Sequence, residues 1–151
     1  MSNAIFLDTG PLGLLAKAPS KPEVIACNAW MRACLAAGHR FYLPEITDYE
    51  LRRKLLHLGL APSIARLDAL QTITTYLPIT TDAMRLAADL WAQARRTGHS
   101  TADPKAIDGD VILAAQALTS GTSAVSIVVA TTNPGHLSHV VASDLWENIK
   151  P

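Results

Sequence analysis

AIFLDTGPLG, residues 4–13, opens with four apolar residues, reaches an acid at Asp8 and continues into a segment rich in turn residues. A short apolar run bounded by turn residues is typical of a strand that is buried on both faces. We therefore expect a fully buried strand over residues 4–8, followed by a turn at residues 9–13, with Asp8 as the last residue of the strand.

Further short apolar runs alternate with helical patterns along the rest of the chain. Strands are expected at residues 40–43, 77–80, 126–132 and 139–142. Helices are expected at residues 22–37, 45–59, 63–76, 81–98, 110–119 and 144–149, with a polar loop at 99–109. This alternation predicts one three-layer α/β/α domain over residues 1–151, built on a central, mainly parallel sheet of four to five strands. The VILAA segment is apolar around its whole circumference, as expected of a helix buried between the sheet and other helices.

The composition excludes several classes of protein. With 49% hydrophobic and 17% charged residues, the chain is too apolar to be disordered. Lys plus Arg equals Asp plus Glu at 13 each, so any nucleic-acid binding must depend on local patches. We expect no signal peptide and no membrane span, because no segment approaches the roughly 18 uninterrupted apolar residues that a span needs. Cys27 and Cys34 are interpreted as reduced core thiols, which favours a cytoplasmic location.

Polar side chains are expected to gather at the edge where the parallel strands end, which is where ligands bind in open sheets of this kind. The candidates are Asp8, Glu50, Asp108, Asp110 and Asn133. Clustered carboxylates repel one another, so either their pKa values rise or a cation lies among them. Oxygen ligands without a His or Cys pattern suit Mg²⁺ or Mn²⁺. Such a site predicts phosphodiester hydrolysis by a metal-activated water.

Four stretches carry a resemblance to a known family. FLDTGPLGLL, ITDYELRRKL, DGDVILAAQAL and VVATTNPGHL, in this order, resemble the motif series of PIN-domain ribonucleases, whose best-known members are the VapC-type toxins of bacterial toxin–antitoxin pairs. The resemblance extends from residue 5 to about residue 146. It implies a Mg²⁺- or Mn²⁺-dependent endoribonuclease that cleaves RNA, commonly forms homodimers and is inhibited by a small antitoxin protein.

The same resemblance assigns roles to individual acids. It implies that Asp8, Glu50 and Asp110 are the first, second and third metal-binding and catalytic acids. The fourth acidic position of the family is occupied here by Asn133, an amide that binds Mg²⁺ more weakly than a carboxylate. Asp108 is a further candidate ligand, although two residues on a helix are about 200° apart, so it cannot simply duplicate Asp110.

Three residues are candidates for contact with the substrate. Thr9 could hydrogen-bond a carboxylate or the scissile phosphate. Arg52 and Arg53, with Lys54, form the densest basic cluster and could hold an RNA backbone, although a solvated helix face is an alternative.

Simpler structural interpretations exist for the acids. Asp108 and Asp110 could cap the helix expected from residue 110, because Asp is a preferred cap and acids in a first turn suit the helix dipole. Glu50 could pair with Lys54 one helical turn away.

Three other functions fit parts of the same sequence pattern. A non-catalytic PIN-like scaffold that binds RNA or a protein partner is the main alternative, and Asn133 is its principal support. Asp8-Thr9-Gly10 also spells the DTG of aspartic proteases, but these enzymes are all-β. A phosphatase with an aspartyl nucleophile usually has a second Asp two residues later, where this chain has Gly10.

Overall fold

The computed structural model describes residues 2–98 and 104–151. Five parallel strands form one sheet in the order β3-β2-β1-β4-β5. The strands are β1 (Ala4–Leu7), β2 (Arg40–Pro44), β3 (Thr75–Leu77), β4 (Ile127–Thr131) and β5 (Ser143–Leu145). The α-helices are α1 (Thr9–Leu15), α2 (Pro22–Ala36), α3 (Glu45–His57), α4 (Ala61–Ile73), α5 (Thr81–Arg96) and α6 (Pro104–Leu118), and three short 3-10 helices are η1 (Ala124–Ser126), η2 (Leu137–His139) and η3 (Trp146–Asn148).

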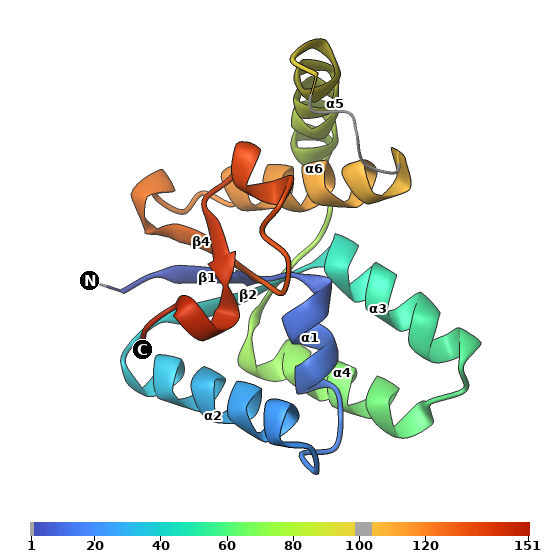
Figure 1. The fold of residues 1–151 in the computed structure, drawn as a ribbon, viewed down its shortest axis with the longest axis vertical. Helices are drawn as coiled ribbons and strands as arrows, with labels where there is room; N and C mark the ends of the chain where they lie inside the picture. The colour runs from blue at the N-terminus through green and yellow to red at the C-terminus, as the bar shows by residue number, and fades with distance from the viewer. Residues whose placement is uncertain (1, 99–103) are drawn as a thin grey trace.

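The sheet lies between two groups of helices, as predicted (Figure 1). Successive side chains of a strand point to opposite faces, and the two central strands are buried on both. Ile5 and Leu7 of β1 pack toward α1, α2 and α4, together with Trp30 and Trp146. Ala4 and Phe6 pack toward α6 on the other face. The chain therefore builds two separate cores, one on each side of β1.

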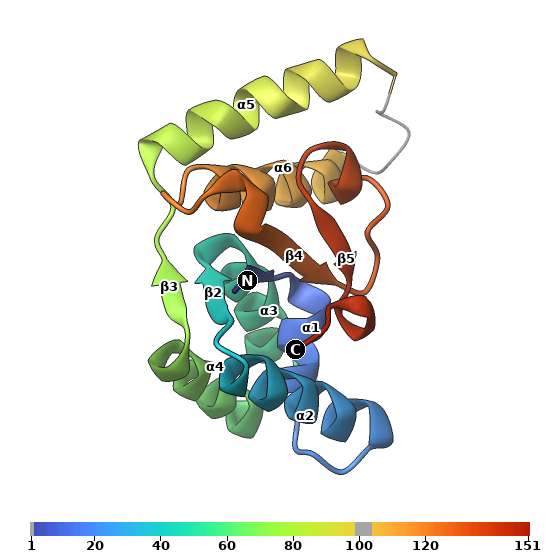
Figure 2. The ribbon, with the colours of Figure 1, turned by 90° about the vertical axis from the view of Figure 1, so that its left-hand side faces the viewer.

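Helix α6 is covered on both sides, which confirms the interpretation of the VILAA segment. Its residues Leu113, Ala114 and Ala117 pack against the sheet, whereas Val111 and Ala115 pack against α5. Figure 2 shows α5 as the outermost layer, with α6 between it and the sheet. Small alanine side chains allow the close approach of both neighbours. Helix α6 is thereby fixed over the sheet, and its first half lies near the carboxyl ends of the strands.

The predicted turn after Asp8 is wrong. Residues 9–15 form α1, whose N-cap is Asp8, so Asp8 follows β1 rather than ending it. Proline is tolerated in the first turn of a helix because the N–H it lacks would have no intrahelical partner there. Pro11 is therefore compatible with α1, and the sequence TGPLG is helical.

Two predicted strands lie elsewhere. The strand expected at residues 77–80 is β3 at residues 75–77, and α4 ends at Ile73. Pro78 has no N–H for a sheet ladder, which ends the strand before it. The strand expected at residues 139–142 is β5 at residues 143–145, because the N–H groups of Val140 and Val141 both bond to the carbonyl of Leu137 in a turn. The expected helix at 144–149 is limited to the 3-10 turn η3.

The polar loop expected at residues 99–109 is wrong from Pro104 onward, and residues 99–103 lie outside the described residues. Helix α6 begins at Pro104 rather than at Asp110. Proline is favoured at the first position of a helix, which is the signal that the polar composition obscured. No helix in the described ranges is long and apolar enough to cross a membrane.

Candidate active site

Asp8 is held at the carboxyl ends of the two central strands. Its N–H bonds to the carbonyl of Ala130 in β4 at 3.0 Å. Its Oδ1 accepts the N–H of Thr9 at 2.7 Å, and its Oδ2 accepts the hydroxyl of Thr131 at 2.7 Å. Both oxygens of the carboxylate thus accept a hydrogen bond. This fixes the orientation of Asp8 without neutralising its charge.

Glu50 reaches the same place from α3. Its Oε1 accepts the hydroxyl of Thr9 at 3.2 Å, so Thr9 hydrogen-bonds a carboxylate, one of the two roles expected of it. Burial raises the pKa of Glu50, as does the charge of Asp8, whereas the Thr9 hydrogen bond and the charge of Arg53 lower it. The ion pairs within 4.0 Å in the described part of the chain are those of Arg52. The alternative interpretation, an ion pair between Glu50 and Lys54, is therefore wrong for the described structure.

Asp110 completes the group from α6. Burial, and then the charges of Asp8 and Glu50, raise its pKa to about 6. Because α6 begins at Pro104, Asp110 lies in the second turn, and the interpretation as a helix cap is wrong. Three half-buried carboxylates from three distant segments therefore act on one another. We call Asp8, Glu50 and Asp110 the carboxylate cluster.

Asp108 lies elsewhere. Its side chain is exposed and lines a pocket beside Met84 and Trp91 of α5, on the outer side of α6. This follows from helix geometry, since residues two apart point about 200° away from each other. Asp108 is also in the second turn of α6, so it is not a cap either. The structure does not bring Asp108 to the carboxylate cluster.

Asn133 lies just past the end of β4 and is exposed. Its backbone N–H donates to the hydroxyl oxygen of Thr131 at 3.0 Å, and Thr131 in turn donates to Asp8. The loop that carries Asn133 is thus tied to the cluster through the side chain of Thr131.

The two arginines of α3 differ in their surroundings. Arg52 donates to both oxygens of the buried Asp48, at 2.9 and 3.0 Å, and to Asp68 of α4 at 2.8 Å. It therefore ties α3 to α4. Arg53 is exposed and lies over the ring of Tyr49 at 5.1 Å, where its charge reaches Glu50. Of the two, only Arg53 has a cationic group free of an ion pair within the described structure.

Several solved structures have an arrangement of strands and helices similar to that of this chain. The chain is similar to VapBC2 from Rickettsia felis bound to a DNA fragment from their promoter, with a TM-score of 0.68 and 13% identity over 95% of this chain and 98% of that chain. It is similar to DNA-bound VapBC from Salmonella typhimurium, with a TM-score of 0.67 and 22% identity over 97% and 99% of the two chains. The fold is PIN-like. VapBC-1 from nontypeable Haemophilus influenzae is also similar, with a TM-score of 0.65 and 17% identity over 96% and 99%.

The PIN-like fold predicted from the four motif stretches is thereby confirmed. No family model and no curated protein matches the sequence. The likeness therefore extends to the fold of the whole chain, while the roles of individual residues depend on the geometry of the cluster itself.

Two residues beside the carboxylate cluster received no role from the sequence. Thr131, 1% exposed, bonds directly to Asp8. The sequence indicated only a threonine at the end of a predicted strand. That this strand lies next to β1 becomes apparent only from the strand order. Gly109 lies in α6 directly against the carboxylate of Glu50. A glycine inside a helix could have indicated such a contact. Gly109 was instead assigned to the predicted loop, because α6 was expected to begin only at Asp110.

The donor chemistry of the cluster fits a hard divalent cation. Within the described residues, no three His, Cys, Asp or Glu side chains converge closely enough to form a ready-made cage. Mg²⁺ does not need one, because it usually binds through one or two carboxylates and keeps several waters. A cation would also offset the repulsion that raises the pKa values of Glu50 and Asp110.

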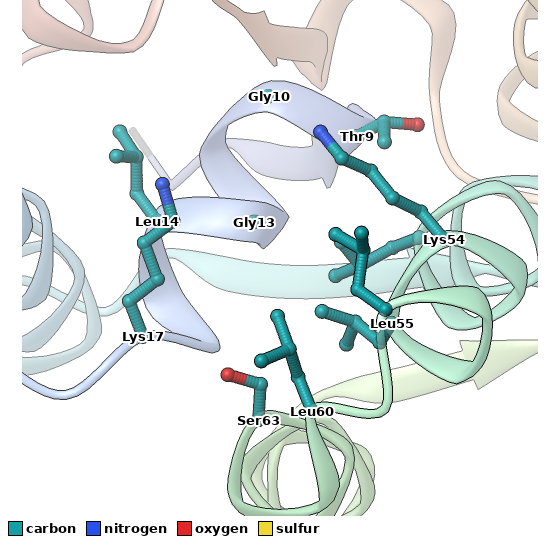
Figure 3. Close-up of a pocket in the computed structure, with 11 residues that line it drawn as sticks. Thr9, Gly10, Gly13, Leu14, Lys17, Lys54, Leu55, Leu60 and Ser63 are labelled. Atoms are coloured by element: carbon teal, nitrogen blue, oxygen red, sulfur yellow. The ribbon is translucent and has the colours of Figure 1, made fainter.

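An apolar pocket of about 420 Å³ adjoins the cluster between α1, α3 and α4. It is lined by Thr9, Gly10, Gly13, Leu14, Lys17, Leu51, Lys54, Leu55, Leu58, Leu60 and Ser63. Figure 3 shows Lys54 extending from α3 toward Thr9 and Gly10 of α1. Thr9 belongs to both features, since its hydroxyl bonds to Glu50. A molecule in the pocket would therefore lie next to the carboxylate cluster.

Proposed function

We propose that this chain is a Mg²⁺- or Mn²⁺-dependent endoribonuclease that acts as the toxin of a toxin–antitoxin pair. The carboxylate cluster carries the proposal. Asp8, Glu50 and Asp110 come from three segments, and none forms an ion pair within 4.0 Å with a described residue. A fold that gathers half-buried carboxylates without a cationic partner loses stability, because each charge is partly desolvated. A bound cation that takes part in a reaction is the function that explains this cost.

The residues of the site would have separate roles. Asp8, Glu50 and Asp110 would hold the ion, some directly through their carboxylate oxygens and the rest through its bound waters. When bound, Mg²⁺ lowers the pKa of a coordinated water and stabilises charge on the leaving oxygen of a phosphodiester. Thr131 orients Asp8, and Thr9 orients Glu50, through the hydrogen bonds described above. Arg53, free of an ion pair and electrostatically coupled to Glu50, would bind the RNA backbone.

We further propose a small antitoxin as the partner, a homodimer as the assembly and the cytoplasm as the location. The support for the partner is that the similar structures are VapBC complexes. The pocket between α1, α3 and α4 offers such a partner an apolar surface that includes the exposed Leu58 and Leu60. A segment seated there would lie against Thr9 and would obstruct access of RNA to the cluster.

The test is cleavage of a mixed RNA pool by the full chain, with and without Mg²⁺ or Mn²⁺. Asp8→Asn, Glu50→Gln and Asp110→Asn should each abolish metal-dependent cleavage. Asp108→Asn is the matched control, because it makes the same change two residues away on the outer side of α6 and should leave cleavage unchanged. Cleavage that persists in Asp110→Asn, or that needs no metal, would overturn the proposal.

A non-catalytic PIN-like scaffold is the second candidate. The observation that favours it is the amide of Asn133 at the position where the resembled family has a fourth acid. Calorimetric titration with Mn²⁺ separates the two, because the nuclease requires the ion and a scaffold does not. Absence of both Mn²⁺ binding and RNA cleavage would favour the scaffold.

A further inference from the structure

Gly109 is a glycine in the second turn of α6 with no backbone reason to be one. The described glycines with positive φ angles are Gly38, Gly59, Gly98 and Gly121, and Gly109 is not among them. In a helix interior, glycine costs about 1 kcal/mol relative to alanine. The requirement for glycine must therefore come from the space around it.

That space is filled by one side chain. A Cβ built on Gly109 would lie 2.9 Å from Oε2 of Glu50 and 3.4 Å from both its Cδ and its Oε1. The three nearest atoms are thus the whole carboxylate group of Glu50. A separation below 3.0 Å is shorter than van der Waals contact, so a methyl group at Gly109 would displace this carboxylate.

The same carboxylate is also bonded by Thr9, whose hydroxyl donates to Oε1 at 3.2 Å. The carboxylate is therefore in contact with both α1 and α6, and moving it away from α6 also alters its hydrogen bond to Thr9. Asp110, the next residue of α6, is close enough for the charge of Glu50 to raise its pKa. Any displacement of the Glu50 carboxylate also changes its position relative to Asp110.

We propose that Gly109 is a positioning residue of the carboxylate cluster: the absence of a side chain in the second turn of α6 sets where Glu50 presents its oxygens to a divalent cation. The inference rests on the proposed metal-dependent function. The carboxylate is the end of the flexible Glu50 side chain and can move, so alanine at position 109 costs the fold little stability. The main effect of the substitution is a changed position of this carboxylate. Glycine at position 109 lowers the stability of α6 but leaves the space that the Glu50 carboxylate occupies.

The test is a double-mutant cycle read by Mn²⁺ calorimetry on the full chain. Gly109→Ala should weaken Mn²⁺ binding by about 10- to 100-fold, the range found when groups that orient metal ligands are changed. Glu50→Asp shortens the side chain by one methylene and frees the space that the new methyl needs. In the Gly109→Ala background, Glu50→Asp should therefore cost much less affinity than in the wild type, or restore part of it.

Gly13→Ala is the matched control, since it is also a helical glycine but its Cβ would meet Cδ1 of Leu51 at an ordinary 3.7 Å. It should show no coupling to Glu50→Asp. If the wild type binds Mn²⁺, an unchanged affinity in Gly109→Ala, or a cost of Glu50→Asp that is the same in both backgrounds, would overturn the proposal.

Crystal structures of the metal-free wild type and Gly109→Ala separate this proposal from the proposed function. A displaced Glu50 carboxylate over an unmoved α6 supports the positioning role even if the wild type binds no Mn²⁺, in which case only the metal function fails. A shifted α6 with Glu50 still bonded to Thr9 would overturn the positioning role.

Discussion

Thr131, at the end of β4, donates its hydroxyl to Oδ2 of Asp8 over 2.7 Å and across 123 residues of sequence. The same hydroxyl oxygen accepts the N–H of Asn133. Asp8 then accepts the N–H of Thr9, whose hydroxyl reaches Glu50. A continuous series of hydrogen bonds therefore runs from the loop after β4 through Thr131, at the end of that strand, and through the start of α1 to α3. Thr131 is the residue that joins the loop to Asp8.

Thr131→Val should destabilise the chain. Valine keeps the shape of threonine but leaves Oδ2 of Asp8 without its donor and the N–H of Asn133 without its acceptor. Because Thr131 is 1% exposed, water cannot replace the hydroxyl freely. We expect a loss of about 1–3 kcal/mol in the free energy of unfolding, measured by urea denaturation of the metal-free chain. Thr131→Ser, which keeps the hydroxyl, should stay close to the wild type, and equal stability of the valine variant would contradict the role of the bond.

The fold was largely predictable because its signals are local. Short apolar runs and helical periods located the central strands and four of the helices, and the all-apolar VILAA segment indicated that α6 is covered on both sides. The errors arose where a local signal competes with a longer-range one. Pro11 and Pro104 favour the prediction of a loop, yet each is compatible with the start of a helix. Only the packing of the flanking residues decides between loop and helix.

The proximity of the three acids of the candidate site was predictable, but the contacts that hold them were not. Asp8, Glu50 and Asp110 were identified from the edge at which parallel strands end and from the motif order. The contacts of Thr131 with Asp8 and of Gly109 with Glu50 join segments that are distant in sequence. They follow from strand order and helix placement, which no local pattern encodes. The same holds for the pairing of Arg52 with Asp68 of α4, whereas Asp48 lies one helical turn away on α3 itself.

Arg52→Met should destabilise the chain by about 1–3 kcal/mol, because the methionine keeps the apolar stem but leaves a buried carboxylate without its cation. Asp48 is 6% exposed, and within the described residues its carboxylate would retain only the 3.2 Å hydrogen bond from Gln71. Thermal or urea unfolding measures the effect. Arg53→Met is the control, since Arg53 is exposed, and it should change stability by no more than about 0.5 kcal/mol. Adding Asp48→Asn to Arg52→Met should recover part of the loss, and a further loss instead would count against the pairing.

Asn133→Asp should strengthen binding of Mn²⁺. The change replaces an amide by a carboxylate in the loop that Thr131 ties to Asp8, and added ligand charge raises the affinity of an oxygen site for a divalent ion. We expect an increase of about tenfold in calorimetric affinity, with lower stability of the metal-free chain because of added repulsion. Asn28→Asp adds the same charge on α2, where the side chain bonds to the carbonyl of Val24, and should not change the affinity. Equal Mn²⁺ affinities of Asn133→Asp and Asn28→Asp would show that residue 133 does not contribute to the metal site.

Asp110→Asn should stabilise the metal-free chain at neutral pH. Burial and the charges of Asp8 and Glu50 raise the pKa of Asp110 from its ordinary value of 3.8 to about 6. The folded chain therefore binds this proton more tightly than the unfolded chain does. The resulting stabilisation is fully present below pH 3.8 and is lost as the pH rises through about 6. At about pH 7.5 the variant, which carries no charge at this position, should be more stable by about 1–2 kcal/mol, an amount reduced for the partial exposure of the side chain.

Urea unfolding of wild type and variant over a series of pH values measures this difference. The gain should shrink as the pH falls and vanish near pH 4, where Asp110 is protonated in the folded chain and the two proteins carry the same charge at this position. Asp108→Asn, on the exposed side of the same turn, should show no such dependence. Mg²⁺ at neutral pH should raise the unfolding temperature of the wild type but not of Asp110→Asn, because a ligand stabilises only the form that binds it. A stability gain that is the same at every pH would mean that packing, not the charge of Asp110, distinguishes the two proteins.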